Sequence, residues 1–255
     1  MGNQDGADFH GRTWYVNRMN QMFADYAAEH QNFLINDICY QSAAYGLDEW
    51  SAPFFWHMYK YSLCLKAIPW MAHNVANIMK SLYGKNKKSL VLDLDNTLWG
   101  GVLGEDGIDG IKIGGDYPGK AFLYFQEGLL ELAKRGVILT ICSKNNERDV
   151  LDLWEKNPFV LLRKEHFSAW RINWRNKADN IRELSEELNI GLDSLVFVDD
   201  NPTERELVRQ MLPMVEVPEF PKQSYMLPDF LISLSDRYFR VYSVTEEDRR
   251  KTEQY

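Results

Sequence analysis

The stretch Lys88-Ser-Leu-Val-Leu-Asp-Leu-Asp-Asn-Thr97 decides the fold of this chain of 255 residues. Its apolar run over residues 89–95 indicates a buried strand, because such a run bounded by polar residues is typical of a strand covered on both faces. The run carries Asp93 and Asp95 at its end. Alternate residues of an extended chain face the same side, so both carboxylates can point toward one place.

Working outward from this strand, apolar runs and helical patterns alternate along the chain after residue 84. This alternation predicts an α/β fold, which we expect to be a three-layer, Rossmann-like parallel sheet. The further strands are expected at Val137–Cys142, Ala169–Trp174, Leu195–Val198 and Met214–Val217, and the helices at 120–135, Glu147–Lys156, Lys177–Asn189 and Thr203–Met211.

The first third of the chain is rich in aromatic residues. Their spacing predicts helices within 12–30, around 56–64 and over 69–84, and Phe33–Ile38 is expected to be a short strand. The basic run Lys85-Asn-Lys-Lys88 marks a domain boundary, and as a charge run its plain interpretation is a solvated connector. We therefore expect a partial N-terminal helical or α/β region over 1–84, a second domain over 85–240 and a C-terminal helical tail over 241–255.

Composition excludes several classes of protein. Hydrophobic residues make up 45% and charged residues 26%, as in soluble globular proteins, and no apolar run reaches the length of a membrane span. The net charge of −8 argues against a nucleic-acid partner. The three cysteines form no metal or disulfide pattern, and the polar N-terminus is not a secretory signal, so a cytoplasmic location is expected.

Three of the predicted strands end in polar clusters. The clusters are Asp93-Leu-Asp-Asn-Thr97, Ser143-Lys-Asn145 and Asp199-Asp-Asn201. In an open parallel sheet, ligands bind outside the carboxyl ends of the strands, so clusters distant in sequence can converge on one site. Lys177 begins a helix between the second and third clusters and can project into the same crevice.

These residue types together favour phosphoryl transfer. Clustered carboxylates repel one another, and Mg²⁺, which prefers oxygen ligands, would relieve that repulsion. The hydroxyls of Thr97 and Ser143 can donate to phosphoryl oxygens, and Lys177 supplies a positive charge. The set suits a mechanism through an aspartyl-phosphate. The alternative is that Asp93 and Asp95 are only turn and cap residues, but the agreement of three clusters favours a site.

The segment from Lys88 to Gly107 resembles the haloacid-dehalogenase (HAD) superfamily, and within it the FkbH-like proteins of the subfamily IIIC type. Ile141-Cys-Ser-Lys-Asn145 and Phe197-Val-Asp-Asp-Asn-Pro-Thr-Glu-Arg205 fit the same group. The resemblance covers about residues 86–217 and implies the HAD fold. The 46 positions from Thr97 to Ser143 leave no room for a large cap domain, and neither do the 34 positions from Ser143 to Lys177.

The resemblance also implies residue roles. Asp93 would be the nucleophile and a metal ligand, Asp95 the general acid and base and a ligand through its carbonyl, and Lys177 the residue that steadies the nucleophile and the phosphoryl charge. The phosphate would be held by Thr97, Ser143 and Asn145, and the third strand end would add Asp200 as a metal ligand with Asp199 in support.

FkbH-like proteins are associated with removing phosphate from 1,3-bisphosphoglycerate and loading the glyceryl unit onto an acyl carrier protein. The resemblance thus implies a phosphatase and glyceryl transferase, with Mg²⁺ as cofactor and a carrier protein and a small-molecule phosphate donor as partners. Cys142 is a candidate acyl acceptor. Its alternative is a packed strand cysteine, which strict alternation favours if Ser143 faces the crevice. Two other functions stay open: a generic HAD phosphatase on a small phosphate monoester or phosphoprotein, and a non-catalytic interaction module.

Two further segments carry expectations. Trp99-Gly-Gly-Val-Leu-Gly-Glu-Asp-Gly107 is expected to form a glycine-rich flap or a surface hairpin. Residues 14–84 resemble the final part of the SGNH-hydrolase-like region that precedes the HAD domain in longer FkbH-like proteins, although no Gly-Asp-Ser block is present.

Overall fold

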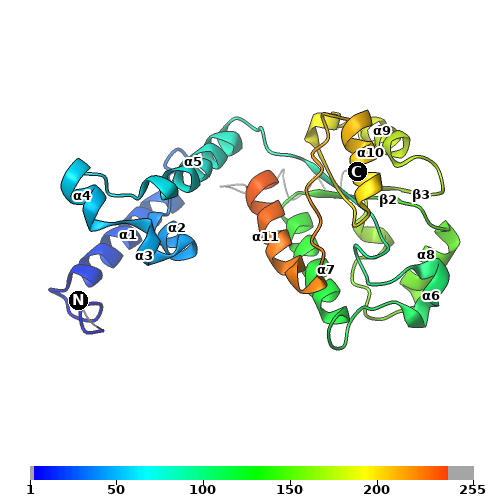
Figure 1. Ribbon diagram of the computed structural model, residues 1–255, viewed down its shortest axis with the longest axis horizontal. Helices are drawn as coiled ribbons and strands as arrows, with labels where there is room; N and C mark the ends of the chain where they lie inside the picture. The colour runs from blue at the N-terminus through cyan, green and yellow to red at the C-terminus, as the bar shows by residue number, and fades with distance from the viewer. Residues whose placement is uncertain (1–2, 241–255) are drawn as a thin grey trace. The chain divides into compact units, whose positions relative to one another are not determined.

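The computed structural model describes residues 3–240, and the chain divides into two compact units between Gly84 and Lys85 (Figure 1). The helical tail predicted over 241–255 lies outside the described residues. Within residues 3–240, no helix combines the length and apolar character that crossing a membrane requires.

The first unit consists of helices in its described part, residues 3–84. They are α1 (Arg12–Glu29), α2 (Ile38–Tyr45), α3 (Leu47–Trp50), α4 (Pro53–Tyr59), the 3-10 helix η1 (Leu65–Ala67) and α5 (Ile68–Leu82). The strand predicted at Phe33–Ile38 is wrong, and with it the α/β description of this region. Ile38 begins α2 instead, because the side chain of Asp37 accepts a hydrogen bond from the Tyr40 amide at 2.8 Å and caps the helix.

The second unit is built on a four-stranded parallel sheet in the order β3-β2-β1-β4, which confirms the predicted α/β fold. Its strands are β1 (Ser89–Leu92), β2 (Ile138–Ser143), β3 (Ala169–Ile172) and β4 (Leu195–Val198). Its helices are α6 (Leu103–Gly110), α7 (Gly119–Lys134), α8 (Glu147–Lys156), η2 (Lys164–His166), α9 (Lys177–Glu187), η3 (Leu192–Ser194), α10 (Pro202–Met211), η4 (Ser224–Met226) and α11 (Leu227–Tyr238).

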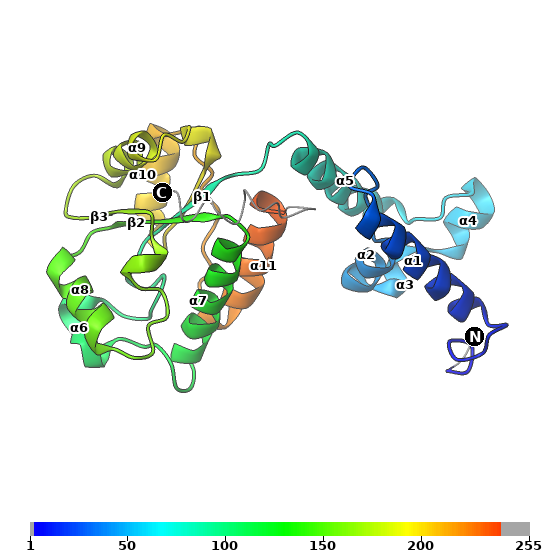
Figure 2. The same cartoon turned by 180° about the vertical axis from the view of Figure 1, so that it is seen from behind.

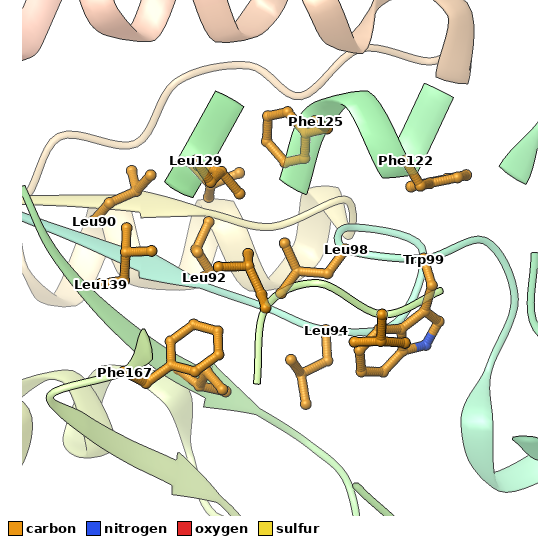
Figure 3. Close-up of a cluster of buried hydrophobic side chains, with 14 of the residues drawn as sticks. Leu90, Leu92, Leu94, Leu98, Trp99, Phe122, Phe125, Leu129, Leu139 and Phe167 are labelled. Atoms are coloured by element: carbon orange, nitrogen blue, oxygen red, sulfur yellow. The ribbon is translucent and has the colours of Figure 1, made fainter. Parts of the chain in front are cut away.

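Helices cover both faces of this sheet, as Figures 1 and 2 show, with α7 and α11 on one face and α9 and α10 on the other. On β1, Leu90 and Leu92 pack with Phe125 and Leu129 of α7 (Figure 3), whereas Val91 belongs to the core on the opposite face. A strand with apolar side chains on both faces is buried on both, which explains the continuous apolar run in the sequence.

Two predicted segments differ in the structure. The segment Met214–Val217 is not a strand but a single bridge of Glu216 to Val196, since the flanking prolines Pro213 and Pro218 cannot donate hydrogen bonds to a ladder. The segment expected to form a flap or a surface hairpin is bridged at Gly100 to Lys112 and is otherwise largely helical. Trp99 is fully buried, and the glycine-rich part that follows folds into α6.

The register of the sheet decides where the site lies. Leu92 of β1 pairs with Ile141 of β2 on one side and with Val198 of β4 on the other. The next residues, Asp93 and Asp199 among them, therefore leave the sheet at one common edge.

Candidate active site

A buried lysine joins two of the strand ends. Lys177 is the first residue of α9, and its Nζ lies 3.0 Å from Asp93 Oδ1 and donates a hydrogen bond of 2.6 Å to Asp199 Oδ2. All three side chains are buried, with exposed fractions of 3% for Lys177, 6% for Asp93 and 0% for Asp199. The structure thus brings together the residues that the sequence predicted to converge.

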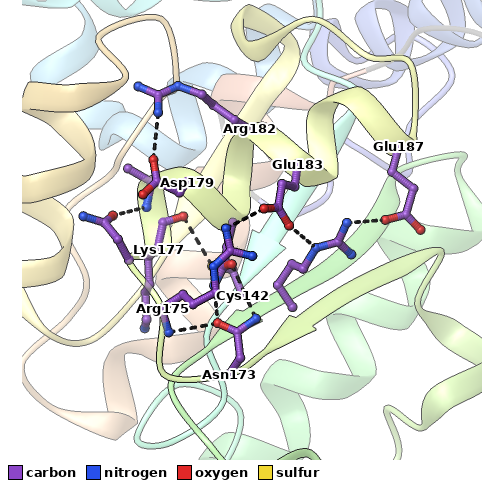
Figure 4. Close-up of polar contacts among 12 residues, drawn as sticks. Cys142, Asn173, Arg175, Lys177, Asp179, Arg182, Glu183 and Glu187 are labelled. Carbon is purple, nitrogen blue, oxygen red and sulfur yellow. Dashed lines mark hydrogen bonds and ion pairs between the residues drawn. The ribbon is translucent and has the colours of Figure 1, made fainter.

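The start of α9 is fixed from two sides. The side chain of Asn176 caps the helix by accepting from the Ala178 amide at 2.8 Å. Further along α9, Glu183 accepts from Arg171 of β3 at 2.9 Å and from Arg175 at 2.6 Å (Figure 4). These contacts tie the helix to the neighbouring strand and thereby hold Lys177 in place.

The electrostatics of the cluster favour a bound cation. Burial lowers the pKa of Lys177, but the charges of Asp93 and Asp199 outweigh it and raise the pKa above its ordinary value. Burial, and after it the charge of Asp93, raises the pKa of Asp200 to about 6, and the pKa of Asp199 is raised for the same reasons. One lysine therefore does not neutralise the acidic groups around it.

Carboxylate oxygens of Asp93, Asp199 and Asp200 all lie within 4.8 Å of one another. Oxygen donors that carry surplus negative charge suit a hard divalent cation. Asp200 lines the pocket described below, whereas Asp199 lies behind Lys177 and does not. The choice of Asp200 as the metal ligand, with Asp199 in support, stays a prediction.

Asp95 lies beside this cluster and is held by three donors. Its Oδ1 accepts from Trp99 Nε1 at 3.0 Å and from the Leu103 amide at 3.1 Å, and its Oδ2 accepts from Asn145 Nδ2 at 2.8 Å. Burial raises the pKa of Asp95, although these hydrogen bonds oppose the shift. The side chain is therefore oriented and more basic than an exposed aspartate.

The predicted phosphate-binding residues separate into two groups. Ser143 lines the pocket. Thr97 and Asn145 do not: the Thr97 hydroxyl accepts from the Asp200 amide at 3.2 Å, and Asn145 donates to Asp95. The Asn145 amide thus orients the carboxylate of Asp95, whereas the Thr97 hydroxyl holds the backbone of Asp200. Contact of these two residues with phosphate stays a prediction.

Cys142 points into the core on the other side of β2. It is fully buried, and its Sγ lies 3.6 Å from the carbonyl oxygen of Lys177 (Figure 4). Burial raises the pKa of the thiol to about 12. Because neighbouring strand residues alternate, Ser143 faces the pocket while Cys142 faces away. The geometry does not support Cys142 as an acyl acceptor.

A pocket of about 310 Å³ opens over the cluster. Its lining includes Lys144 and Glu204, which lie in the predicted motifs but were given no role, and their side chains pair at 2.6 Å. Glu204 lies in the first turn of α10, directly after the acidic cluster at residues 199–201. The sequence signal for Glu204 was its position in the first turn of a predicted helix that begins directly after the acidic cluster. The pocket is otherwise lined by Asp93, Asp95, Asn96, Val102, Ser143, Lys177, Asp200, Asn201 and Pro202.

The chain resembles known proteins over this unit and beyond it. A family described as NLI interacting factor-like phosphatase matches residues 88–245. A crystal structure of the N-terminal part of a Bacteroides fragilis protein, containing a phosphatase domain and complexed with Mg, shares 38% sequence identity with a TM-score of 0.88. The similarity covers 95% of this chain and 64% of that one, so the present chain spans less than two thirds of the length of that relative.

More distant solved structures also align. The 3-deoxy-D-manno-octulosonate 8-phosphate phosphatase of Moraxella catarrhalis shares 22% identity over 58% of this chain and 79% of its own, with a TM-score of 0.34. A HAD family enzyme of Bacteroides thetaiotaomicron, in complex with magnesium and inorganic phosphate, shares 13% identity over 54% and 95%, with a TM-score of 0.37. No curated protein matches the chain.

Proposed function

Because this chain belongs to the NLI interacting factor-like phosphatase family, within the HAD superfamily, we propose that its second unit is a Mg²⁺-dependent phosphatase that works through an aspartyl-phosphate. The observation that carries the proposal is the buried set of Asp93, Lys177 and Asp199 at the edge of a pocket, with Asp200 beside it. A carboxylate, a fixed lysine and surplus acidic oxygens are what phosphoryl transfer to an aspartate needs.

Asp93 is the nucleophile of this proposal. One of its carboxylate oxygens forms a bond to phosphorus while the bond from phosphorus to the leaving oxygen breaks. Lys177, 3.0 Å from Asp93, offsets the negative charge of the carboxylate and of the phosphoryl oxygens. Lys177 keeps its place because its second partner, Asp199, does not line the pocket.

Asp95 serves as general acid and then as general base. It gives a proton to the leaving oxygen and later takes one from the water that hydrolyses the aspartyl-phosphate. Its raised pKa and its three hydrogen-bond donors support this role, since they favour a usable proton and a fixed direction. Ser143 contributes the hydroxyl that lines the phosphate side of the pocket.

Mg²⁺ would be held by Asp93, by Asp200 and by the backbone carbonyl of Asp95. When bound, the ion neutralises charge on the phosphoryl oxygens. The relative from Bacteroides fragilis, which is 38% identical, is complexed with Mg, and this supports the choice of metal.

As the finer function we propose glyceryl transfer from 1,3-bisphosphoglycerate to an acyl carrier protein, on the strength of the FkbH-like motifs in residues 88–107 and 197–205. Attack of Asp93 on the phosphorus of an acyl phosphate would leave a carboxylate. Loading requires instead that a thiol attack the acyl carbon at C1, so that a 3-phosphoglyceryl thioester forms and the phosphate at C1 leaves. Hydrolysis of the remaining C3 phosphate ester through Asp93 then gives the glyceryl thioester and a second phosphate. Since Cys142 is buried, that thiol belongs to the carrier protein.

The phosphatase is tested by phosphate release from p-nitrophenyl phosphate with Mg²⁺, for the native protein and for Asp93→Asn. We expect turnover by the native protein alone, together with a native-protein mass increase of one phosphoryl group under acid quench. Equal turnover by both proteins would exclude Asp93 as the nucleophile.

The glyceryl transfer is tested by intact-protein mass spectrometry with 1,3-bisphosphoglycerate, Mg²⁺ and an acyl carrier protein. A glyceryl mass on the carrier supports the finer function. Phosphate release with an unmodified carrier contradicts it and leaves the generic phosphatase.

A further inference from the structure

A second, larger pocket adjoins the candidate active site within the same unit. It has a volume of about 850 Å³ and shares Asn96, Asp200 and Pro202 with the smaller pocket over the cluster. A molecule whose phosphoryl group lies at Asp93 can therefore extend its remaining part into this space. The volume is in the range that holds a drug-sized ligand, well above the need of a three-carbon unit.

Part of the pocket wall is apolar and rigid. Phe122 and Leu227 come from the hydrophobic core, and Phe220 packs on it, with its ring centroid 5.4 Å from that of Phe230. A Cβ atom at Gly100 would stand 2.9 Å from the Phe122 ring, so the glycine lets backbone and ring meet closely. Such a wall suits an aliphatic or aromatic segment of a ligand.

Two lysines in the lining give the pocket a positive charge. Lys112 is fixed by two backbone hydrogen bonds with Gly100, of 2.7 and 3.0 Å, and Lys222 lies on the segment between α10 and η4. Within the part of the chain that the structure describes, neither side chain has an ion pair or hydrogen bond. Both are exposed to solvent.

Arg205 also lines the pocket, but its guanidinium group is engaged by acceptors of the protein itself. Arg205 is buried, and its Nη1 donates to the carbonyl oxygens of Asp199 and Asp200 at 2.9 and 2.7 Å. Its Nη2 donates to Glu219, which also lines the pocket, at 3.0 Å. The charge left to attract a ligand is therefore that of Lys112 and Lys222.

We propose that this pocket binds the leaving group of the substrate, and that the leaving group has an apolar middle and a second anionic group at its far end, a carboxylate or a phosphate, which Lys112 and Lys222 recognise. The inference rests on the phosphatase part of the proposed function and not on glyceryl transfer. It defines the substrate class as elongated phosphate esters that carry two anionic ends.

Binding of matched phosphonates, which are not hydrolysed, tests the pocket apart from catalysis. Isothermal titration calorimetry compares 6-phosphonohexanoate with hexylphosphonate, both in the presence of Mg²⁺. The two probes differ by the distal carboxylate alone. We expect the native protein to bind 6-phosphonohexanoate about tenfold more tightly, as two exposed ion pairs would produce.

The matched variants are Lys112→Met, Lys222→Met and the double variant, with Lys120→Met as control. Methionine keeps the apolar stem and removes the charge. Lys120 is also exposed but lies over the Tyr124 ring and outside the pocket. We expect the preference for the carboxylate to fall about threefold in each single variant, to disappear in the double variant and to persist in Lys120→Met.

The outcomes separate the two proposals. A native protein without preference, or a double variant that retains the full preference, overturns the assignment of the pocket, whatever the enzyme hydrolyses. Selective binding that the double variant loses supports the assignment, even if p-nitrophenyl phosphate is not turned over; the latter result would count against the phosphatase alone.

Discussion

Replacing Lys177 by methionine is the substitution whose effect the structure defines best. The change removes the one cation between Asp93 and Asp199 while it keeps most of the side-chain volume. Asp199 has no exposed surface, so water cannot take the place of the lysine there. The variant must either hold a buried charge without a partner or bind a proton that the native protein does not need.

The expected loss of stability follows from the two contacts. At 3.0 and 2.6 Å, with an effective dielectric constant of about 20, each contact has a Coulomb energy of roughly 5–6 kcal/mol. The burial of Lys177 offsets much of this sum. Because the loss of one partner from a buried ion pair typically costs about 3–5 kcal/mol, we expect that reduction in the free energy of unfolding near neutral pH.

The loss should depend on pH. Burial and the charge of Asp93 raise the pKa of Asp199 to about 6 in the native protein, while Lys177 lowers it, so the variant's value is higher still. A carboxyl with a raised pKa in the folded state contributes stability below its unfolded pKa and loses that contribution as the pH rises through the folded pKa. The deficit of Lys177→Met is therefore expected to be smaller at pH 5 than at pH 8.

Urea unfolding at pH 5 and pH 8 measures this effect, with and without Mg²⁺. The transition of the second unit is identified as the one that Mg²⁺ moves to higher urea. The control is Lys156→Met, which breaks a 2.7 Å ion pair with Asp152 that is exposed to solvent and should cost about 0.3–0.5 kcal/mol. Equal midpoints for Lys177→Met and Lys156→Met, or a deficit larger at pH 5, would refute the reasoning.

Three further outcomes are expected. Asp93→Asn should accumulate no acid-stable phosphoryl mass with p-nitrophenyl phosphate and should lose at least about 10²-fold in kcat, with an unchanged circular dichroism spectrum as the check on its fold. Cys142 is fully buried and burial raises its pKa to about 12, so iodoacetamide should alkylate exposed Cys39 and spare Cys142 in the folded protein, as peptide mass spectrometry would show; fast labelling of Cys142 would contradict its burial. Arg205→Met removes both hydrogen bonds to the carbonyls of the acidic turn, so its Mg²⁺ dissociation constant by calorimetry should rise about tenfold, while Arg209→Met should retain the native value.

Much of the second unit could be predicted from local sequence signals. The apolar run before Asp93 identifies β1, and parallel strands bring their carboxyl ends to one edge whatever the loops between them. The position of Lys177 follows from its place at a helix start, since a long side chain there reaches back toward the strand ends. Locating the strand ends and the helix starts in the sequence was therefore enough to predict that these residues converge.

The detailed use of each side chain could not be predicted in this way. The Thr97 hydroxyl and the Asn145 amide have the right chemistry for phosphate, but in the structure the hydroxyl accepts from the Asp200 amide and the Asn145 amide donates to Asp95. Nothing in the spacing of the sequence indicates these partners. The composition of Phe33–Ile38 likewise favours a strand, but Asp37 caps a helix that begins at Ile38.

The larger pocket lay beyond sequence reasoning for a different reason. Its walls join Gly100 and Lys112, which are bridged to each other, with the irregular segment that carries Phe220 and Lys222. An irregular segment has no periodicity from which its neighbours follow, and its place is fixed by long-range contacts such as Arg205 to Glu219. Such contacts appear in the sequence only as isolated charges.

The two carboxylate partners of Lys177 differ in distance and in position relative to the pocket, and this difference affects phosphoryl transfer. The lysine is closer to Asp199, which is away from the pocket, than to Asp93, which lines it. If Asp93 becomes phosphorylated, one of its oxygens is taken up by the bond to phosphorus and its charge is redistributed over the phosphoryl group. Lys177 need not move with that charge, because its hydrogen bond to Asp199 holds it in place while it still lines the pocket. A lysine held by Asp93 alone would lose part of its anchor at the moment when the phosphoryl oxygens require it, and this gives Asp199 a role through Lys177 that needs no contact with substrate.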